Sequence, residues 1–269
     1  AWANDNSTLF YAKRDPKTLR SDKIFRTDVH AETYGEKVVY REKDAKFDTF
    51  VYRSKSQAYI IIVSSSSISD EYRLISTNRP KDEFQIFYQR EDHLEYSIEH
   101  IGDQFYILTN ADQAANFKLV TTPANQTSKE NWQVFQDHDE SVLIEDVEIF
   151  TNYIVLSERT KGLSRLKVIP GHQSEKAYYI PIQSETYTLG IATNPQQESH
   201  KLRFAFNSMT TPTQVIEYDM EEKTEKLLKQ QEVPDEKFDP QNYQSRRIWV
   251  KSRDGELIPI SMVFHKDTD

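Results

Sequence analysis

Hydrophobic residues along the chain gather in short runs of aromatic and aliphatic side chains separated by polar turns. The five most apolar runs start 50, 46, 48 and 49 residues apart, at Leu9, Tyr59, Phe105, Tyr153 and Leu202. Runs of this length, rich in β-branched and aromatic residues, predict strands rather than helices. Their even spacing predicts a repeated structural unit of about fifty residues.

Each main run belongs to a group of four strand-like runs. Two further runs follow it, and from the second group on another run precedes it. In the second group the four runs read FVYRSK, YIIIVS, EYRLIST and FQIFYQ, between residues 50 and 89. Four antiparallel strands in a unit of this length are typical of one blade of a β-propeller. A β-sandwich also has short, closely spaced strands, but the recurring order of four favours the propeller.

The most apolar run of each group predicts a strand that neighbouring blades cover on both faces, and the last run predicts a more polar outer strand. We therefore predict an all-β fold: a partial β-propeller of about five four-stranded antiparallel blades over residues 1–243, ending in a β-hairpin over residues 244–269. Segment 219–233, DMEEKTEKLLKQQEV, has charges at helical spacing. Because the repeat places a turn at EEKT between two strands, we predict strands there.

The clearest hairpin pattern is RIWVKSRDGELIPISMVFH, residues 247–265. Two arms of alternating apolar residues flank Asp254 and Gly255, a dipeptide that tolerates the positive φ of a tight two-residue turn. This pattern is the basis for a hairpin domain that follows the propeller.

The composition indicates a globular chain, with 37% hydrophobic and 29% charged residues among 269. A net charge of −9 argues against a nucleic-acid partner. An acidic surface can attract basic peptides, although ordinary solubility more often accounts for such a charge. Six glycines leave no glycine-rich phosphate-binding loop, and the absence of cysteine excludes disulfides and thiolate metal sites. With no visible signal peptide and no apolar run long enough to span a membrane, we expect a cytoplasmic protein without a membrane partner.

Candidate catalytic residues are hard to find. A serine hydrolase places its nucleophile in a Gly-x-Ser-x-Gly turn, and GLSRL at 162–166 lacks the second glycine. The serines at 64–67 border a predicted buried strand, and we interpret them as a polar loop or as the end of that strand. His93 and His100 bracket HLEYSIEH, but this spacing is a weak metal signal, and structural hydrogen bonding is the better interpretation. We therefore expect no catalytic residue, metal site or cofactor in this chain.

Longer motifs identify a family. FNSMTTPTQVIEYDMEEKTEKLLKQQEVP at 206–234, followed by RIWVKSRDGELIPISMVF, resembles the junction between propeller and catalytic domain in the oligopeptidase B (protease II) group of the prolyl oligopeptidase family. Similar matches extend over the rest of the chain: SERTKGLSRLKVI at 157–169, REDHLEYSIEH at 90–100, ANFKLVTT at 115–122 and AWANDNSTLFYAKRD at 1–15.

The resemblance implies a seven-bladed propeller that gates an α/β-hydrolase domain, in a serine peptidase that cleaves small peptides after Arg or Lys. The Ser, Asp and His of its triad belong to the catalytic domain, so none is carried onto a position here. The chain is then an inactive fragment, with the remaining blades before Ala1. Arg253, Asp254 and Gly255 would form an interdomain hinge, and basic oligopeptides would be substrates of the parent enzyme.

A partial ring of blades would expose two apolar faces and unpaired strand edges, which predicts self-association of the fragment, closure into a smaller ring, or disorder at its ends. Three alternatives stay open at this stage. The hairpin could simply close the edge of the propeller, and the chain could be a stand-alone propeller that binds a peptide or protein. A sialidase-type glycosidase is a poorer match, because SRDGELI departs from the Ser-x-Asp-x-Gly-x-x-Trp box of that class.

Overall fold

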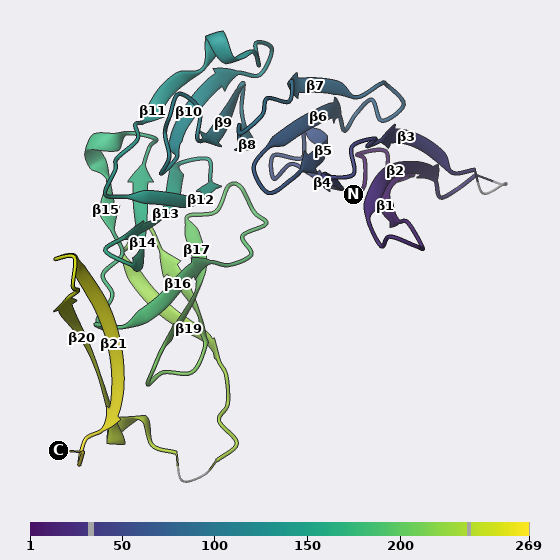
Figure 1. Cartoon of the computed structure of the whole chain (residues 1–269). Coiled ribbons are helices and arrows are strands. Elements are labelled where there is room, and N and C mark those ends of the chain that lie inside the picture. Colours follow the sequence, from purple (N-terminus) through teal and green to yellow (C-terminus); the bar gives the residue numbers. More distant parts are fainter. Residues whose placement is uncertain (32–34, 236–237, 269) are drawn as a thin grey trace. The chain divides into compact units, whose positions relative to one another are not determined.

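The computed structural model describes residues 1–31, 35–235 and 238–268 (Figure 1). Within these ranges the regular elements are β-strands and three short 3-10 turns: Lys129–Asn131, Ser174–Lys176 and Pro240–Asn242. The chain divides into two compact units, Ala1–His138 and Asp139–Asp269. The predicted boundary between a propeller at 1–243 and a hairpin at 244–269 stays a prediction, and residues 32–34, 236–237 and 269 of those ranges lie outside the described residues.

The first unit contains three antiparallel sheets in which strands adjacent in sequence are adjacent in space. The first sheet is three-stranded: β1 (Thr8–Arg14), β2 (Ser21–Asp28) and β3 (Lys37–Arg41). The second is four-stranded: β4 (Asp48–Arg53), β5 (Tyr59–Ser65), β6 (Asp70–Ser76) and β7 (Gln85–Tyr88). The third is also four-stranded: β8 (Tyr96–Ile101), β9 (Gln104–Thr109), β10 (Lys118–Pro123) and β11 (Gln133–Gln136).

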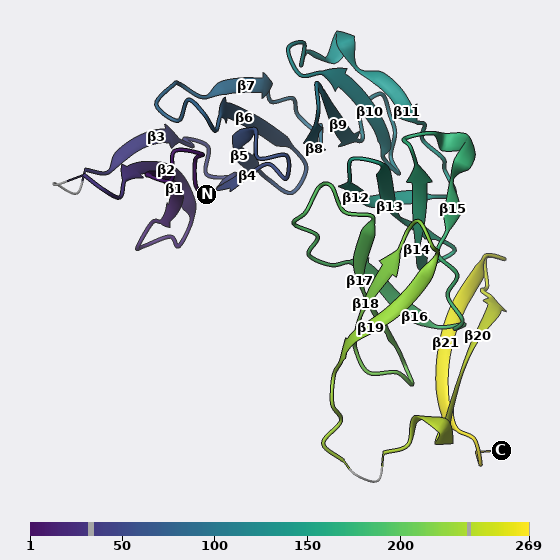
Figure 2. The same ribbon diagram turned by 180° about the vertical axis from the view of Figure 1, so that it is seen from behind.

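The second unit contains two four-stranded sheets and a hairpin. One sheet holds β12 (Leu143–Ile149), β13 (Tyr153–Thr160), β14 (Leu163–Pro170) and β15 (Tyr178–Tyr179). The next holds β16 (Tyr187–Ile191), β17 (Lys201–Ser208), β18 (Gln214–Asp219) and β19 (Thr224–Gln230). The last two strands, β20 (Tyr243–Lys251) and β21 (Leu257–His265), form a two-stranded ribbon of their own, which both views show (Figures 1 and 2).

The all-β fold of repeated antiparallel sheets is therefore confirmed, as is the order of strands within each sheet. Strands β18 and β19, with a turn between them, replace the helix that the charge spacing of segment 219–233 suggested. The burial pattern also follows the expectation. The main strands β5, β9 and β13 are mostly buried, whereas the outer strand β19 is exposed along its whole length.

Apolar side chains are buried between neighbouring sheets of the same unit. In the first unit Ile61 on β5 and Phe105 on β9 belong to one cluster that joins the second and third sheets. In the second unit Val155 on β13 and Phe204 on β17 belong to another, which joins its two sheets. Full burial of such a side chain contributes about 1.5–3 kcal/mol. Face-to-face packing of this kind is what a propeller blade requires.

The face of sheet β16–β19 opposite this cluster is mainly polar. Lys201 and Arg203 on β17 are both exposed, and each forms an ion pair with Glu217 on β18, at 3.5 Å and 3.2 Å. The ion pairs with both cations help to lower the pKa of Glu217 despite the opposing effect of desolvation. The expectation that both end sheets expose apolar faces is therefore wrong for this sheet, because charged residues occupy the alternate positions of its strands.

Candidate functional site

The predicted hinge residues lie at the tip of the β20–β21 hairpin. Arg253, Asp254 and Gly255 are all exposed. The hydroxyl of Ser252 and the amide of Glu256 donate hydrogen bonds to Asp254, and these bonds lower the pKa of that carboxylate. The contacts of these three residues are thus local to the loop, and their role as an interdomain hinge stays a prediction.

The loop itself is one residue longer than the predicted two-residue turn. The amide of Ser252 donates to the carbonyl of Glu256 at 2.8 Å, which leaves three residues between the closing pair. Only Gly255 among them has a positive φ, of 97°. A three-residue hairpin loop needs a single left-handed position at its end, whereas the predicted turn would need two.

The hairpin is attached to the rest of its unit through Arg247 on β20. The guanidinium Nη2 donates to the carbonyl oxygen of Lys161, in the turn between β13 and β14. The backbone amide of Arg247 donates to Oε2 of Glu185 at 3.0 Å. These two acceptors come from segments more than sixty and eighty residues away in sequence, so the attachment is a true tertiary contact.

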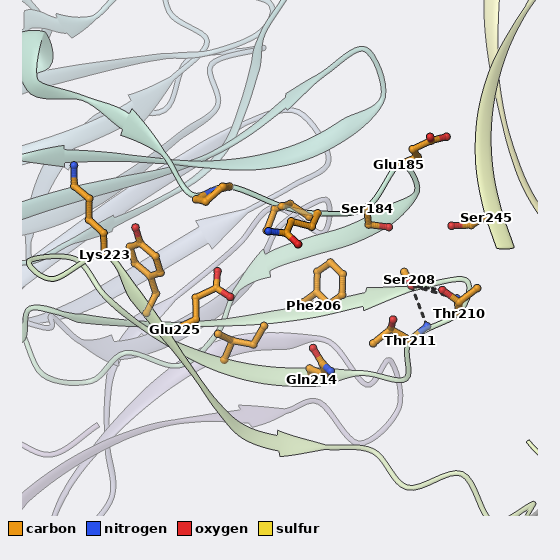
Figure 3. A pocket seen from close by; sticks show the side chains of 15 residues that line it. Ser184, Glu185, Phe206, Ser208, Thr210, Thr211, Gln214, Lys223, Glu225 and Ser245 are labelled. Carbon is orange, nitrogen blue, oxygen red and sulfur yellow. Dashed lines mark hydrogen bonds between the residues drawn. The ribbon is translucent and has the colours of Figure 1, made fainter. Parts of the chain in front are cut away.

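A groove of about 920 Å³ lies within the second unit, next to this attachment. Its apolar floor comes from Phe206, Ile216 and Tyr218 of the last sheet, together with Pro181 and Ile182. Figure 3 shows Ser245 of the hairpin across from Ser184 and Glu185 at one end of this groove. The remaining lining residues are polar: Gln183, Ser208, Thr210, Thr211, Gln214, Lys223 and Glu225.

The chemistry of the groove is that of a binding surface. Ser208, the most engaged hydroxyl, accepts hydrogen bonds from the amides of Thr210 and Thr211, at 3.2 Å and 2.9 Å (Figure 3). A serine nucleophile needs a base within hydrogen-bond reach, and no histidine is found among the described residues that line the groove. The groove can therefore hold a ligand by apolar contact, by hydrogen bonds to neutral side chains and by charged contacts with Glu185, Lys223 and Glu225, but it does not assemble a serine with a histidine base.

The histidines considered as metal ligands occupy different environments. Nδ1 of His100 lies 2.8 Å from the hydroxyl of Ser56, its ring packs against Phe105, and burial lowers its pKa. His93 is exposed and lies in a turn with a φ of 62°. Over the ranges that the structure describes, no group of three or more metal-ligating side chains is found.

The serine motifs have structural roles. Ser164, in GLSRL, is buried within β14, and Gly162 belongs to the turn that precedes this strand. The hydroxyl of Ser66 accepts hydrogen bonds from the amides of Ile68 and Ser69, which close the loop after β5. The serine run therefore lies where the buried strand β5 ends and its loop begins, as expected, whereas Ser164 lies within a strand and only Gly162 of its motif belongs to a connection. In the described part of the chain, no helix is long and apolar enough to cross a membrane.

Sequence reasoning missed Arg247, Lys161 and Glu185. The dipeptide Lys-Gly at 161–162, between two apolar runs, is a recognisable signal for a tight turn. No local pattern, however, indicates that the carbonyl of that turn receives Arg247 from a distant strand.

Comparison with known proteins identifies the family. The family model for the N-terminal β-propeller domain of prolyl oligopeptidases matches residues 1–231. The chain therefore belongs to the prolyl oligopeptidase family of serine peptidases, as part of their propeller domain, and the resemblance noted above is confirmed.

Individual relatives support this assignment over nearly the whole chain. Dipeptidyl aminopeptidase BI of Pseudoxanthomonas mexicana is 34% identical over 267 residues, which cover 99% of this chain and 36% of the relative. Protease 2 of Moraxella lacunata is 24% identical over 263 residues, which cover 98% of this chain and 37% of the relative. The structure of oligopeptidase B from Trypanosoma brucei, with covalently bound antipain in a closed form, has a TM-score of 0.91 at 27% identity and covers 100% of this chain. The chain spans 39% of that structure.

Proposed function

We propose that the chain is the gating propeller of a serine peptidase that acts on short peptides. The observation that carries this proposal is the match of the prolyl oligopeptidase propeller domain over residues 1–231, with an exposed hairpin that begins at Tyr243. A propeller placed over a catalytic domain excludes folded proteins and keeps bulk water away from the reacting bond. The same match favours this role over a stand-alone binding propeller.

Cleavage after Arg or Lys is the specificity that we propose for the parent enzyme. It is supported by the similarity to protease 2 and oligopeptidase B. The net charge of −9 adds a physical reason, because an acidic surface raises the local concentration of basic peptides.

Release of dipeptides from free N-termini is the second candidate activity. The 34% identity to dipeptidyl aminopeptidase BI favours it, and that identity exceeds the 24% to protease 2. The two activities differ in what they require of the substrate: the second needs a free amino terminus two residues from the cleaved bond, whereas an endopeptidase accepts a blocked one.

A pair of fluorogenic peptides separates the two activities in the parent enzyme. One carries an Arg before the reporter and a blocked N-terminus, and the other carries the same last two residues with a free N-terminus. We expect turnover of the blocked peptide; turnover confined to the free one would replace the first activity with the second. The chain by itself should hydrolyse neither peptide, because the groove in its second unit lacks a nucleophile and base. Inhibitor-sensitive hydrolysis by the purified chain would contradict the proposal.

A further inference from the structure

The contact between Arg247 and the β13–β14 turn depends on how that turn is built. Thr160 and Leu163 form the last pair of the two strands, so Lys161 and Gly162 alone make the connection. Both have positive φ, of 49° and 75°. A two-residue turn with two left-handed positions follows the twist of the strands tightly and leaves the carbonyl of Lys161 free to accept a hydrogen bond.

Gly162 provides the space that the guanidinium of Arg247 occupies. A Cβ on Gly162 would lie 2.8 Å from Nη2 of Arg247 and 3.9 Å from Cγ of Pro259 on β21. A contact of 2.8 Å is too short for a side-chain carbon, so a larger residue would displace the arginine. The glycine thus serves both the turn and the attachment of the hairpin.

The hairpin has two different faces. Arg247 and Pro259 lie on the face that is turned toward the β13–β14 hairpin. The opposite face carries Ile248, Val250, Ile258 and Ile260, which are 39 to 50% exposed. The hydrogen bonds to Lys161 and Glu185 both converge on Arg247. These two hydrogen bonds attach the ribbon to the rest of the second unit.

We propose that Arg247 is a positioning residue that latches the β20–β21 hairpin onto the propeller, with Lys161 and Glu185 as its two acceptors. The proposal rests on the gating function proposed above, in which the hairpin leads from the propeller toward the catalytic half of the enzyme. A latched hairpin fixes the catalytic half over the propeller, and release of Arg247 lets the two halves separate to admit a peptide. The latch, rather than the exposed loop at 253–255, is then the point that controls movement.

The latch combines a favourable contribution with an unfavourable one. Hydrogen bonds that involve a charged group are stronger than neutral ones. Against this, Nε of Arg247 is buried without a hydrogen-bond partner among the described residues. A buried donor without a partner is costly and regains water when the hairpin lifts. This gain offsets part of the loss of the two hydrogen bonds, so opening costs less free energy than those bonds alone would require.

Hydrogen exchange of the purified 269-residue chain tests the latch without any assay of activity. In Arg247→Ala we expect the amides of β20 and β21 to exchange about tenfold faster or more, because the charged hydrogen bond to Lys161 is lost. The buried amides of β13 should keep their wild-type rates. Arg246→Ala is the matched control, because Arg246 is the exposed neighbour on the same strand and its guanidinium lies over the ring of Phe264 instead.

Variants of the acceptor make the test independent of Arg247 itself. Glu185→Gln keeps an oxygen that can accept from the amide of Arg247 and should leave hairpin exchange close to wild type. Glu185→Ala removes the acceptor and should accelerate it. If the amides of β13 also exchange faster in Arg247→Ala, that variant has unfolded. The comparison of Glu185→Gln with Glu185→Ala then decides whether the latch exists. Equal exchange of the hairpin in wild type, Arg247→Ala and Glu185→Ala would overturn the latch.

Assays of the parent enzyme distinguish the existence of the latch from its role in gating. If the latch gates entry, Arg247→Ala should raise kcat/KM for long peptides relative to short ones, with Arg246→Ala unchanged. Faster hairpin exchange with no change in that ratio would keep the latch and refute its role in gating. Unchanged exchange would refute the latch, whatever the peptide preference.

Discussion

Replacing Glu42 with Gln should make the stability of the first unit less dependent on pH. Glu42 is 6% exposed and follows β3, whereas its partner Arg90 follows β7 of the next sheet. Nη2 of Arg90 donates to Oε2 of Glu42 at 2.6 Å, and the Tyr40 hydroxyl donates to the same oxygen at 2.8 Å. Burial by itself would raise the pKa of Glu42, but these bonds and one from the amide of Asp44 lower it to about 2.

The magnitude follows from the difference between this pKa and the ordinary value of 4.5. A difference of about 2.5 in pKa corresponds to about 3 kcal/mol in the free energy of unfolding. Because the pKa is lower in the folded state, the contribution is fully present above pH 4.5 and is lost as the pH falls toward 2. At pH 3, about 2 kcal/mol of it is gone.

Urea unfolding followed by tryptophan fluorescence measures the effect at pH 7 and pH 3. Glu42→Gln should be less stable than wild type at pH 7 by up to about 3 kcal/mol, and this difference should shrink by about 2 kcal/mol at pH 3. Glu83→Gln, at an exposed position of the same unit, is the control and should show no such change. A difference between Glu42→Gln and wild type that is the same at both pH values would refute the reasoning.

Two further predictions concern packing and the turn at Gly162. Phe105 is fully buried, and its ring centroid lies 4.9 Å from that of Phe87 and 5.4 Å from that of Tyr59. Phe105→Ala should therefore lower the free energy of unfolding by about 3–5 kcal/mol in urea titrations. A loss below 1 kcal/mol would mean that the two sheets do not pack as described. Gly162→Ala should accelerate exchange of the hairpin amides, because φ is 75° and the new Cβ collides with Arg247. Wild-type exchange in this variant would show that the turn does not support the hairpin.

Most of the fold could be predicted from the sequence because the determining pattern is local. Strands such as β5 and β9 read as continuous apolar runs, since both of their faces are covered, and the polar outer strands mark the end of each unit. At segment 219–233 the helical charge spacing competed with the repeat. The repeat was the better guide, because pairing of β19 with β18 outweighs the weak preference of isolated residues for a helix.

The site was less predictable because its geometry depends on residues far apart in the chain. Asp254 and Gly255 indicated a hairpin correctly, but the pattern does not distinguish a two-residue from a three-residue loop. Arg247 reads as one more charged residue on an alternating strand, and only the folded structure shows that its guanidinium meets the carbonyl of Lys161. The polar face of β16–β19 was missed for a related reason: an apolar run such as LRFAFN was taken to have two apolar faces, whereas Lys201 and Arg203 occupy one of them.

The dependence of the parent enzyme on substrate length tests the gating role most directly. The measurement is kcat/KM for a series of unstructured peptides that share one cleavable bond and differ only in the length of the flanking chain. We predict a steep fall once the peptide is too long to enter beneath the propeller. Equal values across the series, extending to an unfolded protein that contains the same bond, would contradict the account.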